Sequence, residues 1–319
     1  MHVEFTSRAE RWTIPQAAQS PEFLTRQNEI RTQARAVERA GFERFLIADP
    51  LGLPDNGQLA SFILHNTASL GVIVSHCADI VAPTVAAQQF ATLDQLSGGR
   101  LAIQVVAGQC DLDHEAAFAR TDEYLVLLKR LWANDKPFDH EGPFYSIRNG
   151  HVGAKPFGRA QVPLMLGGAS GTAIKVAARH AEIFALPAGS ITETRQIVSR
   201  VQAAAAHHGR ADKIRYSAPV QPIVAATRAE ALARAEQLPA ATEATRLVGT
   251  AEQVARALND YRALGVSAFV LHDLAQPRDI ETFVREVAPR VRGRMEGAGE
   301  FRATGVFLSS PRTRVSYYA

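Results

Sequence analysis

Residues 83–108, PTVAAQQFATLDQLSGGRLAIQVVAG, contain the pattern that decides the fold. Apolar residues recur at helical spacing in the first half of this stretch, which predicts an amphipathic helix. Gly98 and Gly99 end that helix and allow a sharp turn. The apolar run at residues 101–106 then indicates a strand buried on both faces, as in a parallel sheet. A helix followed by a buried strand that ends in small residues is the unit of a parallel α/β barrel, whose functional sites lie at that strand end.

The rest of the chain repeats this alternation of strand and helix, which predicts a (β/α)8 TIM barrel, an α/β fold. A hairpin insertion is expected at residues 138–147. The barrel is predicted to span residues 1–291, and the aperiodic residues 292–319 to form an extended C-terminal arm. The eight expected strands are residues 2–6, 45–48, 71–75, 101–106, 162–166, 183–186, 214–224 and 268–271.

Composition limits the classes of protein to consider. The chain has 319 residues, of which 46% are hydrophobic and 21% charged, and this suits one large barrel domain. Its formal net charge of +3 is too small to argue for nucleic acid. Two cysteines do not indicate a secreted disulfide framework, and we find no signal-type or membrane-spanning apolar run. We therefore expect a soluble cytoplasmic protein that binds neither membrane nor nucleic acid, and we predict no metal site.

Three blocks of sequence, found in the right order, resemble the bacterial luciferase-like flavin monooxygenases, and most of all their alkanesulfonate monooxygenase branch. The first is residues 83–108, with LDQLSGGR at its centre. The second combines RTDEYL at residues 120–125 with the hairpin and with LMLGGAS at residues 164–170. The third is LVGT at residues 247–250. The resemblance covers roughly residues 1–291 and implies the same barrel.

Gly167, Gly168, Ala169 and Ser170 follow a predicted strand and precede a predicted helix. Two glycines let the backbone approach an anion, and free N–H groups at a helix start can bind it. The same four residues also fit an ordinary turn with a serine N-cap. In the resembling family the matching turn binds the phosphate of flavin mononucleotide (FMN), and the resemblance therefore implies that these residues bind it here.

His114 lies at the start of the next candidate element, a helix over residues 114–132. Related monooxygenases carry a histidine and a tyrosine at this spacing, and both reach the flavin phosphate. Phe118 replaces the tyrosine here, and the loss of one neutral hydrogen bond would weaken binding by about 1 kcal/mol. A half-exposed histidine with no ligand fits the residues about equally well.

The ends of the third and fourth strands lie beside the flavin ring in the family. The resemblance implies that Ser75, Ala107 and Gly108 contact the ring, with His76 as a general acid or ring contact. A structural histidine at a strand end is the alternative for His76. Arg8, after the first strand, is a candidate for binding an anionic substrate or phosphate, although a surface arginine is the commoner case. His76 and Arg8 are thus the two catalytic candidates.

Some positions depart from the family. Cys77 stands where relatives usually carry an arginine, and Pro187 opens the segment where they commonly show Trp-Gly-Glu-Pro. The resemblance implies a two-component monooxygenase that uses reduced FMN from a separate flavin reductase and oxygen on a small organic substrate. It also implies a homodimer or homotetramer. The departures leave two alternatives open: a deazaflavin-dependent oxidoreductase, and a degenerate barrel that serves as a binding or structural subunit.

Overall fold

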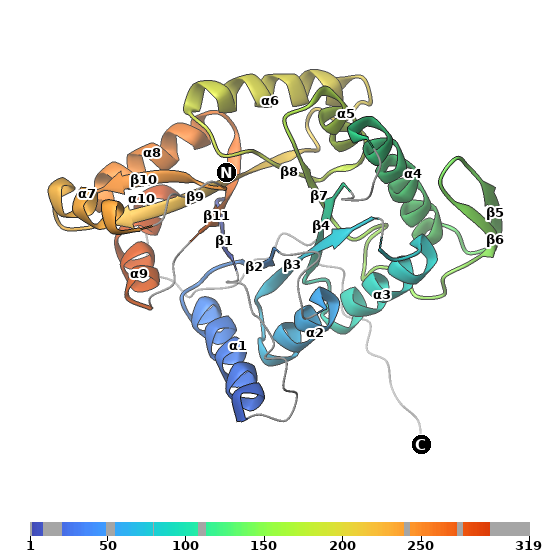
Figure 1. Ribbon diagram of the computed structural model, residues 1–319, viewed down its shortest axis with the longest axis horizontal. Coiled ribbons are helices and arrows are strands. Elements are labelled where there is room, and N and C mark those ends of the chain that lie inside the picture. The colour runs from blue at the N-terminus through green and yellow to red at the C-terminus, as the bar shows by residue number, and fades with distance from the viewer. Residues whose placement is uncertain are drawn as a thin grey trace.

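The chain folds into a closed barrel of eight parallel strands surrounded by helices (Figure 1). The computed structural model describes residues 2–8, 21–48, 55–78, 80–107, 113–238, 243–272 and 277–293, without the side chains of 21–26 and 277. The ring closes because β9 pairs with both β8 and β11, and β11 pairs with β1. Its strands are β1 (Glu4–Arg8), β2 (Arg44–Ile47), β3 (Gly71–Cys77), β4 (Leu101–Val106), β7 (Leu164–Gly167), β8 (Ile183–Ala185), β9 (Arg215–Val224) and β11 (Val266–Leu271).

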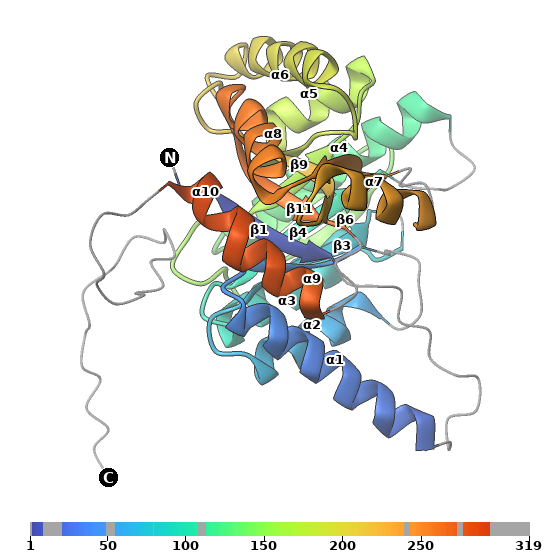
Figure 2. The ribbon, with the colours of Figure 1, turned by 90° about the vertical axis from the view of Figure 1, so that its left-hand side faces the viewer.

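Helices follow the strands and cover the outside of the ring, as the side view also shows (Figure 2). This arrangement confirms the predicted (β/α)8 TIM barrel. The predicted arm lies outside the described residues from residue 294 on. The helices are α1 (Pro21–Arg39), α2 (Asn56–Asn66), α3 (Pro83–Leu96), α4 (His114–Ala133), α5 (Gly171–His180), α6 (Ile191–Ala206), α7 (Arg228–Gln237), α8 (Ala251–Ala263), α9 (Pro277–Thr282), the π-helical turn η1 (Phe283–Val287) and α10 (Ala288–Arg292).

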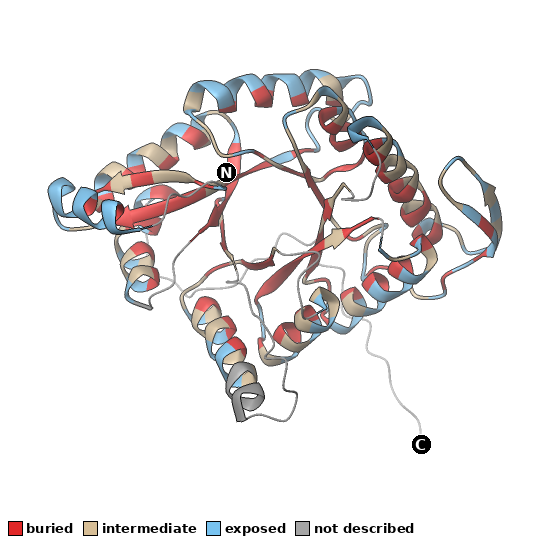
Figure 3. Cartoon of the chain, in the orientation of Figure 1, coloured by how far each residue is buried: buried red, intermediate tan, exposed pale blue. Residues whose placement is uncertain are grey.

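The strands are buried on both faces, which explains their nearly unbroken apolar sequences (Figure 3). Side chains alternate along each strand, so every second residue points into the barrel and the others pack against the helices. A small inner core fills the barrel, and it comprises Leu46, Ile73, Ala102, Met165, Ile183 and Val270. The larger outer core includes Phe5, Val74 and Leu166 from the opposite strand faces.

The LDQLSGGR block of residues 93–100 contacts several neighbouring segments at the N-terminal end of the barrel. Gly98 and Gly99 have φ values of +66° and +84°, so the turn between α3 and β4 requires glycine. Asp94 is fully buried, forms an ion pair with Arg159 and accepts a hydrogen bond from the backbone N–H of Phe157. Arg100 donates hydrogen bonds to the backbone carbonyls of residues 64, 70 and 97. The block therefore builds the barrel and does not enter its mouth.

The structure adds one strand that the sequence pattern did not predict. β10 (Thr245–Gly249) pairs in parallel with the last five residues of β9, of which only the first, Val220, also pairs with the ring strand β11. Its half-polar sequence, TRLVG, lacks the apolar run used to find the other strands. The predicted hairpin is confirmed as β5 (Phe138–Glu141) and β6 (Ser146–Gly150), which ends three residues later than expected.

Candidate functional site

The turn between β7 and α5 presents bare backbone at the mouth of the barrel. A Cβ atom on Gly167 would lie 2.5 Å from the carbonyl oxygen of Ala185, and one on Gly168 would lie 2.7 Å from the Cβ of Ala173. Gly168 also has a φ of +130°, which other residues rarely adopt. Ser170 is the N-cap of α5, and its Oγ accepts a hydrogen bond from the N–H of Ala173 at 3.1 Å. The result is a glycine-lined start of a ten-residue helix, where an anion is favoured.

His114 reaches this helix start from α4. Asp113 caps α4 by accepting a hydrogen bond from the N–H of Ala116, so His114 is the first helical residue. Its Nε2 lies 2.9 Å from the Oγ of Ser170. The Phe118 ring contacts the His114 ring edge-to-face, with centroids 4.9 Å apart, and so helps to orient it. The structure therefore brings together two of the predicted phosphate-binding residues from separate helices. We call Gly167, Gly168, Ala169, Ser170 and His114 the cradle.

Ser75 and Ala107 lie at the ends of β3 and β4, as expected, but on opposite faces of the sheet. Ser75 is buried on the inner face, and its hydroxyl donates a hydrogen bond of 2.9 Å to Oε1 of Gln104, its register partner. The side chain of Asn56 donates to the Ser75 carbonyl at 3.0 Å. Ala107 is half-buried and packs against the outer core. Gly108 lies outside the described residues.

His76 points to the outer face of the sheet, a position that favours the structural histidine over the general acid or ring contact. Its Nε2 is 2.7 Å from the Tyr124 hydroxyl, and its ring packs edge-on against Phe90 with centroids 5.0 Å apart. Burial lowers the pKa of His76 to about 4, so the ring is neutral at pH 7. The physical reason is strand alternation: because Ser75 points inward, its neighbour must point toward α3 and α4.

Arg8 ends β1 on the inner face and has two partners. Its Nη1 lies 2.9 Å from Nδ1 of His272, which directly follows β11, and 2.5 Å from Oε2 of Glu243, which precedes β10. The N–H of His272 donates to the Val220 carbonyl and so extends the β9–β11 ladder by one residue. We call Arg8, His272 and Glu243 the polar triad.

Sequence reasoning missed His272 and Glu243. They lie more than 230 residues from Arg8 in the chain and belong to none of the three matching blocks. One signal was available for His272, since residues that directly follow parallel strands meet at one end of a barrel.

The cradle and the polar triad face each other across the mouth. In the ring order β1-β2-β3-β4-β7-β8-β9-β11, β7 is four strands from β1 in both directions. The cradle follows β7, whereas Arg8 ends β1. Near the mouth, the inner positions of β3 and β4 on one side of β7 and of β8 on the other are uncharged: Ser75, Gln104 and Ala185.

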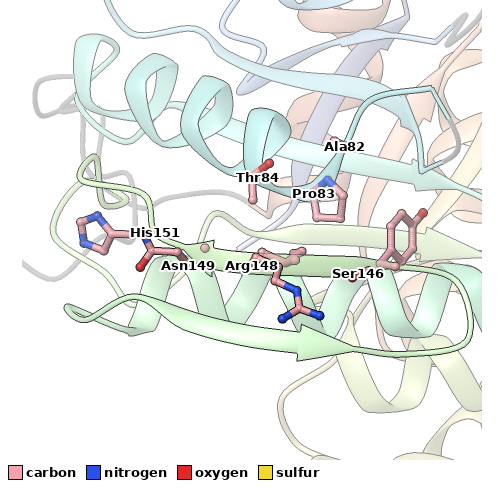
Figure 4. A pocket seen from close by; sticks show the side chains of 10 residues that line it. Ala82, Pro83, Thr84, Ser146, Arg148, Asn149 and His151 are labelled. Atoms are coloured by element: carbon pink, nitrogen blue, oxygen red, sulfur yellow. The ribbon is translucent and has the colours of Figure 1, made fainter.

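A separate groove of about 390 Å³ lies outside the mouth, between the start of α3 and the hairpin (Figure 4). Thr84 and Pro83 form one wall and residues 145–151 form the other. The guanidinium group of Arg148 points away from α3 in this view. No member of the cradle or of the polar triad lines this groove, so it is not the site that the sequence predicted. Among the described residues we also find no cluster of metal-ligating side chains and no helix able to cross a membrane.

The fold and the cradle together define a class of protein: a TIM barrel with a glycine-lined helix start, of the kind that favours an anion, at the carboxyl ends of its strands. The family follows from comparison with known sequences. The family model described as luciferase-like monooxygenase matches residues 1–246, and the chain belongs to that family. The predicted family is thereby confirmed, whereas its alkanesulfonate branch is not.

Individual relatives agree with this assignment. The chain is 27% identical to an FMNH(2)-dependent dimethylsulfone monooxygenase of Pseudomonas putida, over 82% of this chain and 87% of the relative. Among solved structures, a riboflavin lyase with modified FMN and riboflavin superposes with a TM-score of 0.80 at 19% identity, covering 92% of each chain. An F420-dependent secondary alcohol dehydrogenase superposes with a TM-score of 0.75 at 19% identity, covering 92% of this chain and all of the other. These two likenesses show the shared fold.

Proposed function

We propose that this protein is a two-component monooxygenase that uses FMNH2, supplied by a separate flavin reductase, and oxygen to oxidise a small organic substrate. Membership of the luciferase-like monooxygenase family and the FMNH(2)-dependent relative support the cofactor. One structural observation carries the proposal: His114 Nε2 and Ser170 Oγ meet at 2.9 Å beside the glycine-lined start of α5.

The cradle fits the phosphate of FMN. The positions of Gly167 and Gly168 have no space for a Cβ, so the backbone at this turn stays uncovered. The first N–H groups of α5 lack partners within the helix, and the helix dipole favours a dianion there. Ser170 contributes a hydroxyl, and His114 a ring nitrogen able to donate when protonated. The hydroxyl that Phe118 lacks is the one expected donor that is missing.

The chain's own residues would position the cofactor and shape the reaction space, while reduced FMN would supply the electrons that activate oxygen. The cradle would hold the phosphate on one side of the mouth, and the residues at the ends of β3, β4 and β8 would then adjoin the rest of the cofactor. At the ends of β3 and β4, the Ser75 hydroxyl donates its hydrogen bond to the side chain of Gln104. The apolar inner core below them, which includes Ile73 and Met165, closes the barrel floor to water.

The test is an anaerobic titration of the protein with FMNH2, followed by mixing with oxygenated buffer and recording of the flavin absorbance. We expect saturable binding and a rate of flavin reoxidation that differs from that of free FMNH2. The matched variant Ser170→Asp keeps a helix N-cap but places a negative charge in the cradle, and it should bind FMNH2 at least tenfold more weakly.

Two outcomes would contradict the proposal. Binding of reduced F420 in place of FMNH2, with hydride transfer in the absence of oxygen, would indicate the deazaflavin-dependent alternative that the F420-dependent fold neighbour makes relevant. Saturable binding of neither cofactor would indicate a barrel without a redox function. The proposed homodimer or homotetramer is tested separately, by light scattering of the purified full chain.

A further inference from the structure

We propose that the polar triad orients the substrate, and that it selects a neutral group with hydrogen-bond-accepting oxygens, such as a sulfone, over an oxyanion of the same size. The inference deepens the proposed function and rests on it, because it takes the barrel mouth as the place of reaction. It concerns Arg8, His272 and Glu243, which the cradle does not use.

The triad is where a substrate would meet a cofactor anchored in the cradle. Because β1 is diametrically opposite β7 in the ring, a planar group extending from the cradle across the mouth ends near Arg8. Among the described residues at the inner carboxyl ends of the eight ring strands, Arg8 is the only arginine or lysine, since Ser75, Gln104, Gly167, Ala185 and Gln221 carry no charge. A second arginine, Arg246 of β10, lies outside the ring and donates a hydrogen bond to Gln221. A substrate with a polar group would therefore place that group at Arg8.

The guanidinium group of Arg8 keeps one edge open. Both of its partners, His272 Nδ1 and Glu243 Oε2, contact the same nitrogen, Nη1. Nε and Nη2 have no partner among the described residues, and the side chain is 26% exposed. These two N–H groups point in parallel and match a pair of oxygens on one atom. The open edge is therefore suited to a group that accepts two hydrogen bonds.

Glu243 determines whether the open edge of Arg8 favours a neutral or a negatively charged group. Its carboxylate already balances the positive charge of Arg8, so the Arg8–Glu243 pair is neutral as a whole. An oxyanion bound to the open edge would share one guanidinium with a carboxylate and be repelled by it. It would also lose more hydration than a neutral acceptor on entering the mouth. A lone arginine would favour an anion, as the sequence suggests for Arg8, but this pair favours a neutral acceptor.

His272 holds Arg8 in this orientation. A guanidinium group can only donate, so Nδ1 of His272 must accept, and the imidazole is neutral with its proton on Nε2. The His272 backbone is itself fixed by its hydrogen bond to the Val220 carbonyl. His272 is thus a positioning residue for Arg8.

The experiment measures saturation transfer by NMR from the FMN-loaded protein to the methyl groups of dimethyl sulfone and of methanesulfonate, which match in size and differ in charge. Dissociation constants come from titration of each probe. We expect the wild type to bind dimethyl sulfone at least tenfold more tightly than methanesulfonate. Arg8→Gln should weaken the sulfone at least tenfold. Glu243→Gln should strengthen methanesulfonate about threefold, because the Glu243 side chain is 61% exposed and its repulsion is partly screened, and should leave the sulfone nearly unchanged.

Glu252→Gln is the matched control, because Glu252 forms an exposed ion pair with Arg256 on α8, and it should change neither constant. The inference would be overturned by any of three results. These are preference of the wild type for methanesulfonate, an unchanged preference in Glu243→Gln, and no transfer to either probe. The titrations are repeated on the flavin-free protein. Loss of FMN binding together with retained sulfone binding at Arg8 would overturn the proposed function while leaving the triad's selectivity supported.

Discussion

His114 Nε2 and Ser170 Oγ lie 2.9 Å apart although 56 positions separate them in the chain. The contact joins the first residue of α4 to the N-cap of α5. Each residue has an ordinary local explanation, as a helix-start histidine and as a capping serine. Their meeting beside two glycines that tolerate no Cβ combines separate local features into the arrangement that we propose binds a phosphate.

Replacement of Ser170 by alanine should weaken FMN binding by about tenfold or more, because one hydrogen bond to the charged phosphate is lost. The variant also loses an N-cap, so the free energy of unfolding should fall by about 1 kcal/mol. Fluorescence titration of FMN and urea denaturation measure the two effects separately.

Thr227→Ala is the control for Ser170→Ala. Thr227 caps α7 in the same way, and Figure 1 shows α7 and α5 on different sides of the barrel. Its loss should lower stability by a similar amount and leave FMN binding unchanged. Equal weakening of FMN binding in both variants would mean that Ser170 acts only through helix stability.

Replacement of Gly167 by alanine should lower the free energy of unfolding by about 2 kcal/mol. The added Cβ would lie 2.5 Å from the carbonyl oxygen of Ala185, so β7 and β8 would have to separate at the mouth. Gly153→Ala is the comparison, because a Cβ there meets no atom within 4 Å, and it should change stability by less than about 0.5 kcal/mol. Equal denaturation midpoints in urea for the two variants would contradict this account of the turn.

Acid should destabilise the protein partly through His76. Burial lowers the pKa of His76 to about 4, compared with 6.5 in the unfolded chain. Between these values the unfolded state binds a proton that the folded state does not, so stability is lost as the pH falls below 6.5. The loss from this residue amounts to roughly 3 kcal/mol by pH 4.

His76→Gln keeps a polar partner for the Tyr124 hydroxyl and removes the titrating group. Its stability should therefore fall less steeply than that of the wild type between pH 6.5 and pH 4. Some slope should remain, since burial also lowers the pKa of His180. Chemical denaturation at several pH values measures the slopes, and parallel curves for wild type and variant would rule out this role of His76. His65→Gln, at an exposed position on α2, is the control and should keep the wild-type slope.

Replacement of Asp94 by asparagine should cost about 3 kcal/mol, because it leaves Arg159 without its buried counter-charge. Asp212→Asn is the comparison, since Asp212 pairs with Lys213 at 3.4 Å on the surface, and such pairs contribute less than about 1 kcal/mol. Urea denaturation of both variants checks the difference. A small effect at Asp94 would mean that the LDQLSGGR block is dispensable for the barrel.

The elements that the sequence predicted well are those with a strong local signal. Gly98 and Gly99 marked the turn before β4, and the apolar runs placed both ends of all eight ring strands to within two residues. β10 was not predicted because its sequence is half-polar, and only the second half of β9, which extends past its pairing with β8 and so offers an edge to pair with, explains why a strand forms there.

Only the part of the candidate site that lies within one continuous sequence motif could be predicted from the sequence. Ser170 and the preceding glycines lie within one turn, so their role as a helix start can be read locally. The sequence placed His76 and Ser75 together at a strand end but did not show which of them faces the mouth. That choice depends on which face of β3 meets α3 and α4, which is a property of the closed ring.

The sequence by itself determined the barrel, because the periodicity of apolar residues and the position of glycines act over a few residues at a time. Tertiary structure alone decided what surrounds Arg8. Glu243 and His272 come from distant parts of the chain, and they reach Arg8 only because ring closure places β11 beside β1 and because β10 pairs with the end of β9. Charge compensation at the mouth is therefore a consequence of strand order, which no local pattern encodes.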